Sequence, residues 1–101
     1  MRIAPTAQGV FYIATGLWPI LHLRSFLRVT GPKRDTWLVQ TLGGLIAAVG
    51  AALLVDKSRT LGIASAMTLG VADVTFAGKG RISPVYFADA VAEGALAALW
   101  L

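Results

Sequence analysis

Residues 42–55 have the sequence LGGLIAAVGAALLV, in which no side chain is polar. A helix in a soluble bundle needs a polar face that recurs with the helical period, and this run offers none. With its flanks it gives about 20 mostly apolar residues, the length that crosses about 30 Å of hydrocarbon at 1.5 Å per residue. The segment therefore indicates a helix that spans a membrane.

The composition of the whole chain agrees with a membrane protein. Of its 101 residues, 56% are hydrophobic and 14% are charged, whereas soluble domains contain about 25% charged residues. This length accommodates a single domain. The chain has no cysteine, which excludes disulfides and cysteine-based metal sites.

Three further segments resemble the first in length and apolar character, so we expect one integral membrane domain over residues 1–101. The predicted spans are residues 6–27, 36–55, 58–77 and 84–101. Pro19 predicts a kink in the first span, because proline removes a backbone hydrogen bond. The short polar turn at residues 56–59 predicts that the second and third spans are antiparallel neighbours. The predicted fold class is an all-α, four-transmembrane-helix antiparallel bundle.

Basic residues lie in short loops between the apolar runs, a distribution typical of topology signals and not of a nucleic-acid partner. The first and third loops carry six of them, and the opposite side carries three: Arg24, Arg28, Lys33, Arg34, Lys79 and Arg81 against Arg2, Lys57 and Arg59. The excess places these two loops in the cytoplasm. We therefore expect an integral membrane protein, surrounded by membrane lipids, with both termini on the outer side.

Small residues recur every four positions on the predicted spans. The second span carries two such ridges, Gly43–Ala47–Ala51 and Gly44–Ala48–Ala52. Lipid tails are as apolar as leucine, so close van der Waals packing across small residues must hold the helices together. Two interpretations stay open: packing within one bundle, and a homo-oligomeric interface, since two ridges on one helix exceed what a single neighbour requires.

Three acids lie inside the predicted spans: Asp73 in the third, Asp89 and Glu93 in the fourth. An ionisable group at membrane depth costs from about 2.5 kcal/mol upward unless a partner compensates for it. Asp89 and Glu93 are four residues apart and share a helix face. Their carboxylates repel in a low dielectric unless a cation lies between them or one carries a proton.

The ends of other spans on the same side of the membrane supply further polar groups. Arg24 is the nearest basic candidate to pair with the acids, and His22 could donate to one of them or relay a proton near neutral pH. Tyr86 lies on the helix face of Asp89 and Glu93. We predict a polar site of these six residues in the cytoplasmic leaflet.

The predicted function is binding or transport of a small cationic or protonatable ligand. The alternative is a structural or accessory bundle whose charges pair internally. Asp73 and Asp89 fit both interpretations, whereas Glu93 lies too deep for stabilisation by a helix terminus. The chain shows no nucleophile constellation or tight metal-ligand motif, so we expect no catalytic residues, metal or cofactor.

Two segments carry a resemblance, residues 25–33 (SFLRVTGPK) and residues 80–93 (GRISPVYFADAVAE). They resemble stretches of a family of small bacterial four-span membrane proteins without an assigned activity. Together with the orientation above, this resemblance implies a bacterial inner membrane with both termini periplasmic. The length and span count also resemble those of the small multidrug resistance transporters, which place an essential glutamate in their first helix. The first predicted span here has no acid, so that resemblance is limited to architecture.

Overall fold

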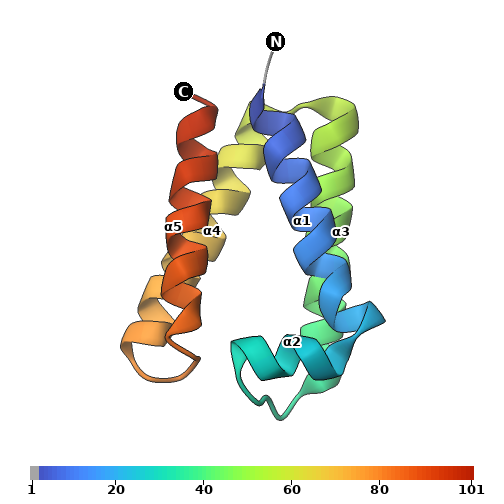
Figure 1. The fold of residues 1–101 in the computed structure, drawn as a ribbon. Coiled ribbons are helices and arrows are strands. Elements are labelled where there is room, and N and C mark those ends of the chain that lie inside the picture. Colours follow the sequence, from blue (N-terminus) through green and yellow to red (C-terminus); the bar gives the residue numbers. More distant parts are fainter. Residues whose placement is uncertain (1–2) are drawn as a thin grey trace.

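The computed structural model describes residues 3–101, and this part of the chain is all-helical. Its helices are α1 (Ile3–Leu21), α2 (Leu23–Thr30), α3 (Thr36–Asp56), α4 (Arg59–Gly78) and α5 (Val85–Leu99). The four longer helices run alternately up and down, and α2 lies across one end of the molecule (Figure 1). The all-α prediction is therefore confirmed. Arg2, counted above among the outer basic residues, lies outside the described residues.

Two helices, α3 and α4, are long and apolar enough to cross a membrane. A third span is available if α1 and α2 count as one broken segment. Helices α3, α4 and α5 coincide with the predicted segments to within two residues. The α3–α4 turn places Lys57 in the left-handed region at φ 54°, and the Ser58 side chain then caps α4 by accepting a 3.1 Å hydrogen bond from the Leu61 amide.

The first predicted segment, residues 6–27, does not form one helix. The chain breaks at His22, and α2 turns away from α1 by 112°. The break follows Pro19 by three residues and comes where the apolar run gives way to an amphipathic one. Because α2 carries charged residues on one side, it is suited to lie across the end of the molecule instead of continuing through hydrocarbon.

The long helices form two pairs, α1 with α3 and α4 with α5. The pairs meet near the chain termini and separate toward the end where α2 lies (Figure 1). The prediction that residues 36–55 and 58–77 pack as neighbours is therefore wrong: α3 and α4 are joined by a short turn, but each packs mainly on another helix. The short turn makes α3 and α4 run in opposite directions, whereas contacts between small residues determine which helix each of them packs against.

Glycine contacts explain the α1–α3 pair. Gly16 and Gly43 lie directly against each other, so that a Cβ on either residue would overlap the backbone carbonyl of the other. Further along the pair, a Cβ on Gly50 would come within 2.7 Å of the Gly9 carbonyl oxygen. Gly43 and Ala47 of the first ridge thus pack against Gly16 of α1, whereas Ala51 of the same ridge is exposed. A Cβ on the neighbouring Gly44 would have no contact closer than 3.6 Å.

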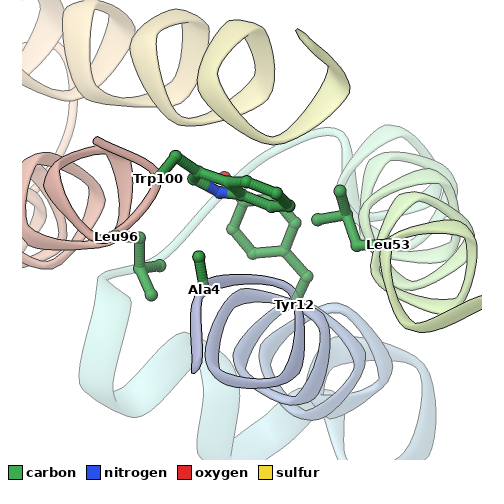
Figure 2. Packing of buried hydrophobic residues seen from close by; sticks show 5 residues of the cluster. All are labelled: Ala4, Tyr12, Leu53, Leu96 and Trp100. Atoms are coloured by element: carbon green, nitrogen blue, oxygen red, sulfur yellow. The ribbon is translucent and has the colours of Figure 1, made fainter. Parts of the chain in front are cut away.

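The apolar core lies at the end where the two pairs meet. Figure 2 shows the Trp100 and Tyr12 side chains at its centre, with Leu53 and Leu96 on either side. Trp100 follows the last turn of α5 and packs directly on Gly62 of α4, where a Cβ would overlap the indole ring. This core holds the helix pairs together and brings the polar groups of α1, α4 and α5 close to one another.

Candidate functional site

A buried amide links three elements beside the core. Gln8 of α1 is fully buried; its side-chain nitrogen donates a 2.8 Å hydrogen bond to the Gly62 carbonyl oxygen. Its side-chain oxygen accepts a 2.5 Å bond from the Trp100 indole nitrogen. Both ends of the amide are therefore occupied by the protein itself, which makes Gln8 a structural link between the helix pairs.

One turn further along α1, Tyr12 reaches an acid. Its hydroxyl donates a 2.6 Å hydrogen bond to Oε1 of Glu93 on α5. Tyr12 is 1% exposed and Glu93 is 2% exposed, so this bond lies in the interior. The bond connects the two helix pairs at a second point and gives Glu93 one neutral partner.

The other two acids of the predicted site lie close to Glu93. Asp89, half-buried on α5, is near enough to interact electrostatically with both Glu93 and Asp73 of α4. Asp73 is 6% exposed, and within residues 3–101 its Oδ2 atom has no hydrogen-bond partner. In this part of the chain, the charged groups that act on Asp73 and Glu93 are themselves acids. The described residues thus bring together three carboxyl groups without a basic residue among them.

Tyr86 stands between these acids and a lysine. It is near enough to Asp73 and Asp89 to interact with them, and its ring centroid lies 5.2 Å from Nζ of Lys33. The same Nζ is 5.2 Å from the Phe26 ring centroid and donates a 2.7 Å bond to the Thr30 hydroxyl. Burial lowers the pKa of Lys33. We call Lys33, Tyr86, Phe26 and Thr30 the lysine latch, because it joins the α2 end of one helix pair to α5 of the other.

The remaining predicted site residues lie elsewhere. His22 sits at the α1–α2 break, where its Nδ1 accepts a 3.2 Å hydrogen bond from the Ser25 amide and so caps α2. Arg24 is exposed on α2. Among residues 3–101, the side-chain hydrogen bonds of His22 go to Ser25, and the acids are grouped without either basic residue. The predicted pairing of the acids with His22 and Arg24 depended on a straight first span, which the 112° bend removes.

Sequence reasoning assigned Tyr12, Gln8 and Lys33 no role in the site. Gln8 and Tyr12 are spaced four residues apart in an otherwise apolar run, so both side chains share one helix face. That spacing is a usable signal for a polar face turned toward other helices. Lys33 gave no comparable signal, because its contacts depend on the break at His22.

An open groove lies between α4 and α5, beside the acids. It has a volume of about 330 Å³ and is lined mostly by small and apolar residues, with Glu93 among them. Its lining residues are Ala66, Met67, Gly70, Val71, Val74, Thr75, Ala90, Glu93 and Gly94. A Cβ on Gly70 would lie 3.5 Å from Cβ of Glu93, so the glutamate stem contributes to the floor of the groove.

Comparisons with known proteins add no functional information: no family model matches the chain, and no curated protein or solved structure gives a significant match. The resemblance carried by residues 25–33 and 80–93 stays a prediction. Within residues 3–101, no three His, Cys, Asp or Glu side chains are arranged to hold a metal ion. The polar groups that the structure brings together at this site are three carboxyl groups and a tyrosine hydroxyl.

Proposed function

We propose that this protein is a small integral membrane protein that binds, and in its cycle transports, a proton or a small organic cation at Asp73, Asp89 and Glu93. The observation that carries the proposal is the interior Asp73 carboxyl with one oxygen unpartnered, next to two other acids. Ionisable groups inside membrane helices face partners, cavities or ligands. Here the nearest charged groups are like-charged, so a bound proton or cation is the compensation that the cluster lacks.

The four-span arrangement is part of the same proposal. The lengths of α3 and α4 and the up-and-down course of the four long helices support it. The excess of basic residues at the α2 end supports an orientation with that end in the cytoplasm and both termini on the outer side. The resemblance carried by residues 25–33 and 80–93 supports a bacterial inner membrane, in which the termini are periplasmic. The acids then lie between the two helix pairs, with Tyr12 on the side of the termini and the lysine latch toward the cytoplasm.

Ligand-induced stabilisation of the purified protein tests the proposal. We would titrate detergent-solubilised protein with methylammonium and tetraethylammonium chloride at constant ionic strength and follow the melting temperature. A ligand that binds only the folded state raises this temperature, by the equivalent of about 2.7 kcal/mol at 100 times its Kd. Proton binding is followed on the same samples as the infrared carboxylic-acid band between about pH 6 and about pH 9, a range in which ordinary exposed carboxyl groups are ionised and do not contribute.

Asp89→Asn is the informative variant, because Asp89 is half-buried and lies between the other two acids. We expect it to abolish the ammonium-induced shift and to alter the carboxylic-acid band. Asp35→Asn, at an exposed acid in the α2–α3 loop, is the matched control and should leave both unchanged. If neither cation shifts the wild-type melting temperature and no carboxylic-acid band titrates, the proposed site is refuted.

The alternative is a structural bundle, and a specific observation favours it. The buried Gln8 amide has partners at both ends, and Tyr12 binds Glu93, so polar groups do link the helix pairs. Under this alternative Asp89→Asn would lower the stability of the ligand-free protein, and no cation would stabilise the wild type. The proposed function predicts instead that ligand-free Asp89→Asn keeps its stability and that a cation stabilises the wild type.

Homo-oligomerisation is a further part of the proposal. The second small ridge of α3, Gly44–Ala48–Ala52, is not taken up by α1 in the way that Gly43 is. Ala48 is exposed, and a Cβ on Gly44 would meet a single side-chain atom. A surface of this kind permits close approach of a helix from a second copy.

A further inference from the structure

Helix α2 has two chemically different sides. Leu23, Phe26, Leu27 and Thr30 recur at the spacing of one helix face, and these residues are buried or half-buried against the rest of the protein. Arg24 and Arg28 lie on the other side and are exposed. Trp18 of α1 holds the apolar face of α2 against the rest of the protein. Its indole donates a 2.8 Å hydrogen bond to the Ser25 hydroxyl and packs edge-on against Phe26, with the ring centroids 5.3 Å apart.

The bend of 112° places α2 across the end of the molecule (Figure 1). The α2–α3 and α4–α5 loops lie at the same end and carry further basic residues. Five of the six basic side chains at this end are exposed: Arg24, Arg28, Arg34, Lys79 and Arg81. One exposed acid, Asp35, lies at the same end. The helix therefore presents its arginines on a strongly positive end, at the level where the apolar lengths of α3 and α4 begin or finish.

We propose that α2 is an interfacial helix whose arginine side binds the headgroups of anionic phospholipids. The inference rests on the membrane insertion in the proposed function and is independent of cation binding by the acids. Amphipathic helices with basic polar faces lie in the plane of the interface, where they are attracted by anionic lipids. Guanidinium groups suit this partner, since they bind phosphate oxygens through paired hydrogen bonds. Charge complementarity and the orientation of α2 select lipid as the occupant of this surface.

Selective association with a spin-labelled lipid tests this inference. The full-length protein is reconstituted in phosphatidylcholine vesicles that contain a small fraction of spin-labelled phosphatidylglycerol or spin-labelled phosphatidylcholine. The motionally restricted fraction in the electron paramagnetic resonance spectrum gives the relative association of the two lipids. We expect the wild type to prefer phosphatidylglycerol, and Arg24→Gln with Arg28→Gln to lower this preference by up to ~5-fold per arginine. Salt should weaken the preference as well.

Controls separate the inference from its premises. Lys57→Gln, at an exposed lysine in the turn at the opposite end, should keep the wild-type preference. Circular dichroism checks that the double variant is folded, and Arg28→Gln alone provides a milder change. An absent preference in the wild type, or an equal loss with Lys57→Gln, overturns the inference. If the protein does not insert into the vesicles, the membrane insertion on which this inference rests is refuted. Asp89→Asn should keep the wild-type lipid preference, because lipid binding by α2 does not depend on cation binding by the acids.

Discussion

The Tyr12 hydroxyl is the one uncharged partner that Glu93 has from the opposite helix pair. Hydrogen bonds between membrane helices contribute about 0.6 kcal/mol on average and up to about 1.7 kcal/mol. That contribution is smaller than the cost of about 2.5 kcal/mol or more for an ionised acid at membrane depth. The bond to Tyr12 alone therefore does not account for Glu93, and Asp73 lacks even such a partner at Oδ2. Energetics at this scale favours a ligand or a proton over a purely structural role.

Lys33 makes the stability of the protein sensitive to alkaline pH. An unfolded lysine titrates near a pKa of about 10.4, and burial lowers the pKa of Lys33 in the folded protein. Between these two values the unfolded chain binds more protons than the folded one, so the free energy of unfolding rises with pH. Below both values the cost of burying the charge is present in full, and above both it is gone.

The measurement is the difference in unfolding free energy between wild type and Lys33→Gln in mixed micelles, from neutral pH to about pH 10.4. We expect the unfolding free energy of the wild type to increase relative to that of the variant as pH rises. If the unfolding free energy of the wild type instead falls relative to that of the variant, the two aromatic rings stabilise the charged amine by more than burial destabilises it.

At the scale of helices, glycine contacts decide which elements pair. Gly43→Ala should separate α1 from α3, because the added Cβ would overlap the Gly16 carbonyl. Overpacking of this kind costs about 1–3 kcal/mol. Gly44→Ala, one residue along the same helix, meets no atom closer than 3.6 Å and should be neutral or stabilising by up to about 1 kcal/mol, since alanine is the better helix former. Equilibrium unfolding of both variants checks this, and equal losses would contradict the pairing of α1 with α3 through Gly43.

The helices could be predicted from the sequence more completely than their arrangement. The run at residues 42–55 and the polar turn at residues 56–59 determine α3 and the start of α4 through local chemistry. The break at His22 was missed, because Pro19 indicates a kink and says nothing about its size. The α1–α3 pairing was missed too, since it depends on Gly16 meeting Gly43 and on Gly9 meeting Gly50, which lie 27 and 41 residues further along the chain.

The acid cluster could be predicted only in part, because its acids follow from local spacing whereas their partner depends on how distant helices pack. The spacing of Asp89 and Glu93 places them on one helix face, and depth along the span adds Asp73. Their uncharged partner Tyr12 comes from α1, and the choice among tyrosine, histidine and arginine depends on how α1 and α5 pack. Because α1 ends at Leu21, His22 and Arg24 turn away with α2, and the acids meet a hydroxyl in place of a basic group.

For the molecule as a whole, the proposed orientation in the membrane is the property most open to test. The chain has no native cysteine, so single cysteines report their side without background. Lys79→Cys lies at the end of α4 beside the basic loops, and Thr60→Cys lies at its start; both positions are exposed. We expect a membrane-impermeant thiol reagent on intact cells to label Thr60→Cys and to spare Lys79→Cys. Labelling of Lys79→Cys would reverse the proposed orientation.

The separation of the helices into two pairs also bears on how the chain is made. The α1–α3 pair is complete once Asp56 has been synthesised, whereas its polar partners on α4 and α5 belong to the later half of the chain. At about 5–20 residues per second, the remaining residues take on the order of 2–9 s. During this interval Gln8 and Tyr12 lie on a finished helix pair without Gly62, Trp100 or Glu93 to bind. The nascent chain thus exposes two polar side chains on α1, which are buried only when α4 and α5 pack against the first pair.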